Sequence, residues 1–331
     1  MTLDSSRRAA LRDLKLRTLV RDHLGRGVSP VMTNTSSFGR GAAFVDDGVA
    51  WVLIEDQPER SLGAALAWMR KQDGAAELAI IAEASSGILA RRAELFTTPI
   101  LVLHAIDRVL VPAVPDGYPP IVALDDRHEA YRALIEQGGA EAVEEHGVLM
   151  GEVRGLEVCR VVTDPATGEV HLEVGIGAHD REAFALLHGA RPTVEALAEV
   201  AATVAAHRRP GADPHPLNRL GAERFLRWQS MQSPERLGVR SVRPAPPPVV
   251  RTNLKDPVPC VALGERADGS SVVFVYSTGI DLDLVPFAVD AQAMLDRHAD
   301  LVLVVPARDA SPITRGVAGL AKVPISMLEW D

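Results

Sequence analysis

The same order of segments occurs twice in this chain, once near each end. Residues 41–105 read as hairpin, helix, strand, helix and strand, and residues 258–330 repeat that order. The second and third strands are 27 residues apart in the first copy, counted from Trp51 to Leu78, and 28 apart in the second. A repeat of element order at matched spacing is typical of an internal duplication. We therefore predict two related units.

The apolar runs of these copies define the expected fold. Strand-like runs such as LAIIAE and LVLVVPA are almost wholly apolar, as parallel strands covered on both faces are. Right-handed crossovers then place helices on both sides of each sheet. We predict an α/β fold in which duplicated three-layer α/β/α units (hairpin-helix-strand-helix-strand) flank a smaller α/β segment.

Proline-rich connectors suggest the domain boundaries. VPAVPDGYPP and RPAPPPVV lie between the repeats and favour extended, stiff segments. Three domains are predicted: 1–118 with an N-terminal helix and the first unit, 119–250 with the middle segment and a basic helical region, and 251–331 with the second unit.

Other elements are predicted from apolar periodicity and breaker residues. A helix is expected over 5–24 and a loop over 27–41. The middle segment is expected to form the following elements: a helix over 128–146, strands over 148–153, 155–162 and 169–175, and helices over 180–189 and 193–207.

Composition excludes several classes of protein. Apolar residues make up 47% and charged residues 24% of the 331 residues, which is ordinary for a globular protein. No apolar run approaches the roughly 20 residues of a membrane span, and the first residues lack the apolar core of a secretory signal. Cys159 and Cys260 both lie in strand-like runs and are expected to be buried structural thiols. A cytoplasmic protein without membrane partners is predicted.

Charge is unevenly distributed along the chain. The net charge is −9, yet residues 207–256 carry ten Lys or Arg against four acidic residues, a local charge of +6. Such a segment can form an electrostatic footprint for nucleic acid or another anion. It can equally pair with acidic neighbours elsewhere in the chain.

The hairpin GLEVCRVVTDPATGEVHLEVG carries one acid on each arm, Glu157 and Glu173. With its flanking helices, the region 128–190 resembles the core of the restriction-endonuclease-like, or PD-(D/E)XK, nuclease superfamily. The resemblance implies a divalent cation, Mg²⁺, held by these two carboxylates, with Glu152 as a third ligand. The position of the family's lysine is occupied by Gly175.

The alternative for this hairpin is structural. Leu156, Val158 and Leu172 alternate with the acids, so Glu157 and Glu173 would then point to solvent.

The turn after this hairpin, LEVGIGAHDREAF, is a second candidate site. A dinucleotide cradle is excluded because Asp180 stands where the third glycine is needed, and a carboxylate there repels phosphate. His179, Asp180 and Arg181 are instead the candidate catalytic residues, with the imidazole as a proton carrier. The alternative is a charged turn in which Asp180 caps the next helix.

The basic segment offers the candidate anion-binding residues. At about 100° per residue, Arg219, Arg224 and Arg227 fall on one arc of a single predicted helix. Guanidinium groups suit bidentate contacts with phosphate or carboxylate. The candidate nucleic-acid or anion-binding set is His215, Asn218, Arg219, Arg224, Arg227 and Lys255.

Acidic residues follow corresponding strands of the two copies. Asp281 and Asp283 lie between strand and helix in the second copy, and Glu55, Asp56 and Glu59 lie there in the first. The carboxyl ends of strands are where open α/β sheets bind ligands, so one interpretation is that these acids bind a cation. The alternative is that they only favour the start of the next helix.

Three functions are open on these grounds. The first is a nucleic-acid-associated protein of nuclease-like, degenerate architecture. The second is a small-molecule enzyme acting on an anionic substrate, phosphorylated or carboxylated. The third is a non-catalytic assembly or regulatory protein, for which a homo-oligomer is one possible state.

Overall fold

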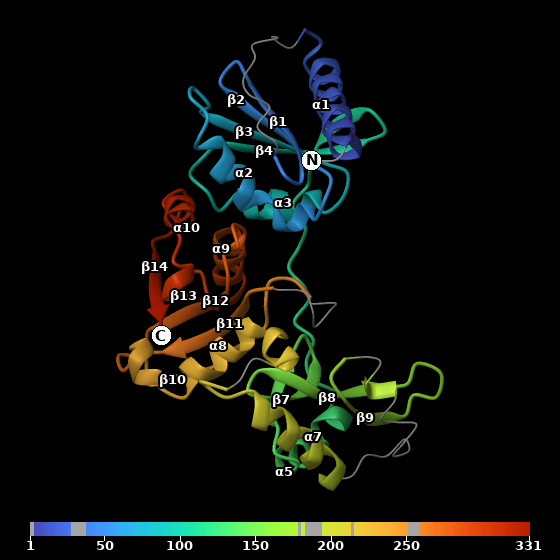
Figure 1. The fold of residues 1–331 in the computed structure, drawn as a ribbon, viewed down its shortest axis with the longest axis vertical. Coiled ribbons are helices and arrows are strands. Elements are labelled where there is room, and N and C mark those ends of the chain that lie inside the picture. The colour runs from blue at the N-terminus through green and yellow to red at the C-terminus, as the bar shows by residue number, and fades with distance from the viewer. Residues whose placement is uncertain (1–2, 28–37, 178–179, 183–193, 213–214, 251–257) are drawn as a thin grey trace. The chain divides into compact units, whose positions relative to one another are not determined.

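The chain forms two compact units in the computed structural model (Figure 1). Unit 1 comprises Met1–Gly117, Ile280–Ala293 and Ala310–Ile325, and unit 2 comprises Tyr118–Gly279, Met294–Asp309 and Ser326–Asp331. The structure describes the following residues: 3–27, 38–177, 180–182, 194–212, 215–250 and 258–331. Helices and β-sheets occur together, which confirms the α/β class. The division into three domains stays a prediction.

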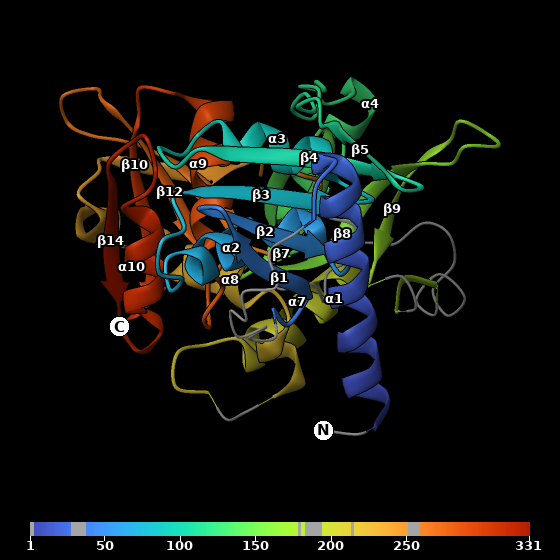
Figure 2. The same ribbon diagram turned by 90° about the horizontal axis from the view of Figure 1, so that it is seen from above.

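Unit 1 is built on a five-stranded sheet. Its strands are hydrogen-bonded in chain order: β1 (Gly41–Asp46), β2 (Val49–Ile54), β3 (Glu77–Ala82), β4 (Ile100–Ile106) and β5 (Val109–Pro112). The β1–β2 and β4–β5 pairs are antiparallel, whereas β2, β3 and β4 run parallel. Figure 2 shows β1 to β4 lying side by side.

Helices cover the sheet of unit 1. α1 (Leu3–Leu24) packs on β1, β2 and β5, where its Leu16 and Val20 join a buried cluster with Phe44. α2 (Leu62–Met69) packs on β3, and α3 (Ser86–Ala93) packs on β4. Val52 and Ile54, which alternate with strand residues of the α1 cluster, are also buried, as expected for a sheet covered on both faces. Unit 1 also contains η1 (Pro58–Arg60), α10 (Pro312–Ala318) and most of α9 (Leu284–Leu295).

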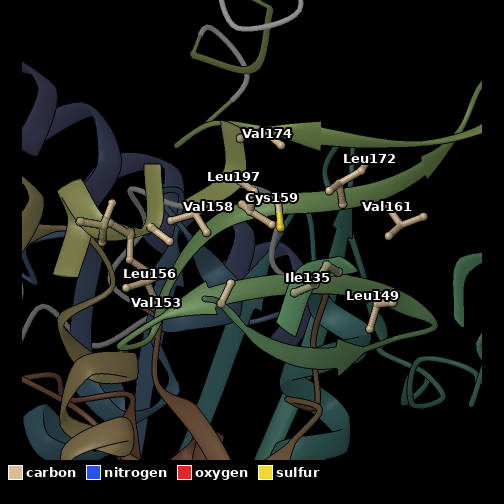
Figure 3. Packing of buried hydrophobic residues seen from close by; sticks show 13 residues of the cluster. Ile135, Leu149, Val153, Leu156, Val158, Cys159, Val161, Leu172, Val174 and Leu197 are labelled. Atoms are coloured by element: carbon tan, nitrogen blue, oxygen red, sulfur yellow. The ribbon is translucent and has the colours of Figure 1, made fainter. Parts of the chain in front are cut away.

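Unit 2 contains a four-stranded antiparallel sheet. Its strands are β6 (Glu141–Glu145), β7 (Val148–Val153), β8 (Leu156–Thr163) and β9 (Val170–Val174). α5 (Arg132–Gln137) and α7 (Val194–His207) pack on β7, and α7 also packs on β8. Figure 3 shows Ile135 of α5 and Leu197 of α7 in the same apolar cluster as Val158 and Val161 of β8. This cluster is the core beneath the predicted acidic hairpin.

A second five-stranded sheet completes unit 2. Its strands are β10 (Ser241–Ala245), β11 (Cys260–Glu265), β12 (Ser271–Tyr276), β13 (Asp300–Pro306) and β14 (Ile325–Trp330). α8 (Ala222–Met231) packs on β11 and β12, and Leu226 joins the apolar cluster of Ala262 and Phe274. The short helices of unit 2 are α4 (Asp126–Glu129), η2 (Pro216–Arg219), η3 (Pro234–Leu237) and η4 (Ala307–Asp309).

The repeated element order is visible in strand pairing. β1 and β2 form an antiparallel hairpin followed by the parallel strand β3, and β11, β12 and β13 pair in the same way. Each sheet also contains one further antiparallel strand, at a different place in the chain. In the first sheet it is β5, which comes after the four other strands, and in the second sheet it is β10, which comes before them. Duplication as the origin of this likeness stays a prediction.

The predicted helix over 128–146 is wrong in its second half. α5 ends at Gln137, and Glu141–Glu145 form strand β6, paired with β7. Gly138 and Gly139 follow the helix, and Gly139 adopts a φ of 79°, which is unfavourable for most other residues. EAVEE is rich in residues that favour helices, but strand pairing and burial of Val143 override that weak preference.

Three hairpins of the two units use the same two-residue turn. The turns are Asp47-Gly48, His146-Gly147 and Arg154-Gly155, and all six residues have positive φ angles. This is the type I′ geometry that matches the twist of paired strands. Only the Asp-Gly turn was expected from the sequence, because His-Gly and Arg-Gly are not among the residue pairs typical of type I′ turns.

Two further predictions lie partly outside the described residues. The loop over 27–41 includes residues 28–37, and the helix over 180–189 is described only for its first three residues. The helices predicted over 5–24 and 193–207 correspond to α1 and α7. No helix in the described ranges is both long and apolar enough to span a bilayer.

Candidate functional site

The three predicted metal ligands lie on the central and edge strands of the four-stranded sheet. Glu152 of β7 and Glu157 of β8 are register partners, and Glu173 lies on β9 opposite Arg160. Glu152 and Glu157 are only 2% and 0% exposed, whereas the Glu173 side chain is 37% exposed. The solvent-facing alternative therefore does not hold for Glu157, because this sheet is buried around that position.

Glu152 is held by arginines from the basic segment. Arg224 donates one hydrogen bond to Glu152 and another to Glu145, which is 2.5 Å away. Arg227 donates from Nη2 to Glu152 Oε2 at 3.1 Å and from Nη1 to the Val261 carbonyl. Two carboxylates and two guanidiniums thus neutralise each other in a buried cluster.

The charge state of Arg224 follows from this pairing. Burial disfavours its charged form, but Glu152 and Glu145 outweigh that cost and raise the pKa of Arg224. The predicted metal ligand and the predicted anion-binding arginines are therefore partners of each other.

Glu157 and Glu173 share a guanidinium. Arg160 binds Glu157 through two hydrogen bonds of 2.9 and 3.1 Å. Arg181 lies 3.6 Å from Glu157 Oε1 and 2.9 Å from Glu173 Oε2. The Arg181 side chain thus lies between the two carboxylates, where the sequence predicted a metal ion. Arg181, predicted as catalytic, acts here as a bridge between two carboxylates.

The other two predicted catalytic residues of this region are Asp180 and His179. Asp180 is exposed at the first helical position after the turn, and His179 lies outside the described residues. Among the residues that the structure describes, no three His, Cys, Asp or Glu side chains are grouped so that they could hold a metal ion.

The single basic helix predicted around residues 219–227 is wrong. η2 ends at Arg219, and Gly221 in the left-handed region separates it from α8. Arg219 is exposed, but Arg224 and Arg227 are buried, so the three do not share a surface. The arginines of α8 face inward because Glu145 and Glu152 lie there.

His215 and Asn218 are partly buried at the entrance to η2. The Leu217 amide donates to His215 Nδ1 at 3.3 Å, and the His215 ring stacks on His207 with 3.8 Å between ring centroids. Lys255, the last member of the predicted anion-binding set, lies outside the described residues.

A buried arginine that the sequence did not single out organises this region. Arg208 is fully buried and donates to the carbonyls of Arg154, Leu217, Leu220 and Gly221. Burial lowers its pKa to about 10, although Glu152 and Glu223 oppose the shift. Its guanidinium fixes the chain between α7 and α8, and no local sequence pattern distinguishes it from its exposed neighbour Arg209.

The acids at the strand ends of unit 1 also bind arginines. Arg92 donates to Asp283 Oδ2 at 2.7 Å and to Asp290 Oδ2 at 2.9 Å. Arg91 binds Asp290 through two hydrogen bonds of 2.9 Å, and all four side chains are buried. Burial raises the pKa of Asp283 to about 7, against the opposing effect of Arg92.

The other acids of this set are held closer to the surface. Asp281 pairs with Arg60 at 3.2 Å, and Glu55 pairs with Arg12 and Lys15. Asp283 directly precedes α9, and its carbonyl accepts from Phe287 in the first turn of that helix. A helix-starting role thus fits Asp283, with the carboxylate committed to Arg92.

The two cysteines are buried free thiols, as predicted. Burial raises the pKa of both Cys159 and Cys260 to about 12, so neither forms thiolate near neutral pH. We expect no reaction of the folded chain with a disulfide reagent such as DTNB, and release of two equivalents after denaturation. A thiol that reacts in the native protein as fast as free cysteine would contradict this burial.

A groove in unit 2 combines polar side chains with proline-rich, apolar walls. Its volume is about 450 Å³, within the range of small-molecule sites. The apolar part of its lining comes from residues 119–122, β6, β10 and the end of α9, and it includes four prolines. The polar part consists of the side chains of Arg132, Glu144, His146 and Arg243.

His146 is the most unusual residue of this groove. It occupies the β6–β7 turn with a φ of 52°, a left-handed value that residues other than glycine seldom adopt. Its Nε2 atom is buried and has no hydrogen-bond partner among the described residues. A buried polar atom without a partner costs free energy unless a ligand or water completes it. The sequence prediction missed His146, because it was assigned to a helix end.

Arginines supply the positive charge of the groove. Arg243 on β10 is exposed, and no ion-pair partner for it exists in the described part of the chain. Arg132 is committed to Glu129 through hydrogen bonds of 2.5 and 2.9 Å. The free guanidinium of Arg243 and the uncompleted imidazole of His146 therefore suit an anionic ligand.

Comparison of the sequence with known proteins does not identify a function for this site. The sequence matches no protein-family model and no curated protein.

Proposed function

We propose that unit 2 binds a small anionic molecule, phosphorylated or carboxylated, in the groove formed by β6, β10 and the segment 119–122. The observation that carries the proposal is His146, a residue of the groove lining whose buried Nε2 lacks a hydrogen-bond partner within the described residues. A ligand oxygen at that nitrogen would complete the hydrogen bonding of the imidazole.

Arg243 supports an anion rather than a neutral ligand. Charge-assisted hydrogen bonds from a guanidinium to phosphate or carboxylate are roughly twice as strong as neutral ones. Pro119, Pro120, Pro244 and Pro246 restrict the backbone around the groove, so little conformational entropy is lost when a ligand binds.

The chemistry open to this site is acid–base chemistry. Imidazole is the side chain most often used as a general acid or base in catalysis. In this proposal His146 takes the role that the sequence assigned to His179 and Asp180. Glu152 and Glu157 keep a structural role, since arginines already satisfy their charge.

Thermal denaturation in the presence of inorganic phosphate, pyrophosphate or citrate tests the proposal. A probe at about 100 times its Kd should raise Tm by roughly 5–10 °C. Arg243→Gln should weaken the binding of that probe about ten- to a hundredfold. Arg240→Gln is the matched control, because Arg240 is another exposed arginine, is paired with Glu265 and does not line the groove.

A second variant isolates the imidazole. His146→Asn removes the ring but keeps a residue that tolerates the left-handed turn. It should bind the probe more weakly without a large loss of stability. If no anionic probe changes Tm, or if Arg240→Gln and Arg243→Gln weaken binding equally, the groove is not the site.

A further inference from the structure

The exposed side of α8 carries aromatic rings, whereas its charged residues are buried. Phe225 and Trp228 are half-buried, while Glu223, Arg224 and Arg227 lie inside. The two aromatic rings are nearly parallel, with 5.9 Å between their centroids and 5° between their planes. A helix normally shows the opposite distribution, with apolar residues inside and charges outside.

Both rings are fixed in place by neighbouring groups. The Arg208 guanidinium lies 5.0 Å from the Phe225 centroid, and that of Arg154 lies 5.4 Å from the Trp228 ring. Trp228 Nε1 donates to Glu141 Oε1 at 2.6 Å. Arg154 and Arg208 are themselves held by backbone carbonyls. The rings are therefore ordered before any ligand arrives, which lowers the entropic cost of binding.

Exposed cations accompany these rings in the same part of the chain. Arg209 follows the buried Arg208, and Arg219 precedes Gly221 at the start of α8. Both are exposed, and neither has an ion-pair partner in the described ranges. The stacked rings of His207 and His215 lie on the segments that Arg208 ties together.

We propose that this surface, made of Phe225, Trp228, Arg154, Arg209 and Arg219, binds single-stranded nucleic acid by base stacking and phosphate contacts. Aromatic rings with nearby guanidiniums bind unpaired bases without strong sequence preference. Exposed arginines supply the phosphate contacts and make binding sensitive to salt. This activity is separate from the groove and does not depend on the function proposed for it. The proposed surface includes part of the basic segment 207–256. Of the arginines predicted from the sequence to bind anions, it includes only Arg219.

Fluorescence offers a selective readout. Trp51, Trp68 and Trp330 are buried, and Trp228 is the partly exposed one of the four tryptophans. Titration of the full chain with oligo(dT) or oligo(U) at low salt should quench Trp228. Because one lost stacking contact is worth about 1–3 kcal/mol, Trp228→Leu should weaken binding of a labelled oligonucleotide by roughly 5- to 150-fold. Trp228→Phe keeps a ring and should retain most of the affinity.

The phosphate contacts are tested by salt dependence. Arg219→Gln should weaken binding and reduce the slope of log K against log salt by about one. Arg240→Gln, which replaces an exposed arginine next to β10, should change neither quantity, and the groove variant Arg243→Gln should also bind oligonucleotide normally. Circular dichroism confirms that each variant is folded.

Three results would overturn the proposal. One is the absence of oligonucleotide binding at low salt. Another is equal affinity for duplex and single-stranded DNA, because a duplex hides its base faces and such binding is electrostatic alone. The third is an unchanged affinity in folded Trp228→Leu.

Discussion

Glu152→Gln is expected to lower the free energy of unfolding by about 3–5 kcal/mol. The substitution leaves Arg224 and Arg227 buried, with Glu145 still bound to Arg224. Removing one partner of a buried ion pair is costly, because the other charge stays desolvated. Urea denaturation followed by circular dichroism measures the change.

The matched control is Glu173→Gln on the same sheet. Its side chain is 37% exposed, and water screens its contact with Arg181. We expect a change of no more than about 1 kcal/mol. The comparison separates burial from the mere loss of a negative charge.

The sign of the Glu152 effect also distinguishes structure from metal binding. In an unfilled metal site neighbouring carboxylates repel each other, so replacing one of them stabilises the protein without the metal. A loss of several kcal/mol in metal-free buffer supports the ion-pair role. Stabilisation by Glu152→Gln would revive the nuclease-like interpretation with Mg²⁺.

The second large effect concerns pH and Asp283. Burial raises the pKa of Asp283 in the folded chain from an ordinary value near 4 to about 7. Between these two pH values the folded state therefore binds more protons than the unfolded state. The contribution of this carboxyl to the free energy of unfolding is fully present below about pH 4 and is lost as the pH rises through 7. The corresponding slope approaches about 1.4 kcal/mol per pH unit.

Asp283→Asn isolates this contribution. The charged groups around Asp283 are Arg92, Arg60, Asp281 and, through Arg92, Asp290. Asn cannot titrate, so the variant should gain stability relative to the natural chain as pH rises from 4 to 7. Unfolding free energies of both proteins across that interval measure the difference.

Asp73→Asn serves as the reference for the pH series, because Asp73 is exposed in a loop of unit 1. Its stability difference from the natural chain should stay nearly constant with pH. A pH-independent difference for Asp283→Asn as well would show that Arg92 keeps Asp283 ionised in the folded chain throughout this range.

Strands with apolar runs were predictable because burial on both faces leaves few polar positions. The hairpin at Asp47-Gly48 and the parallel strands after it follow from such runs and from turn chemistry. β6 was missed because EAVEE satisfies helix preferences, and only its pairing with β7 makes it a strand. The turn at His146 was missed for the same reason, and with it the groove.

The sequence by itself determined the α/β class, the main strands and the burial of both cysteines, since these depend on local apolar patterns. Only the tertiary structure decided which charged side chains are buried and which groups they pair with. Glu152 and Arg224 are 72 residues apart in the chain, and nothing local marks either as buried. A charged residue enters a protein interior only when a partner from another segment meets it there, so its role depends on the fold as a whole.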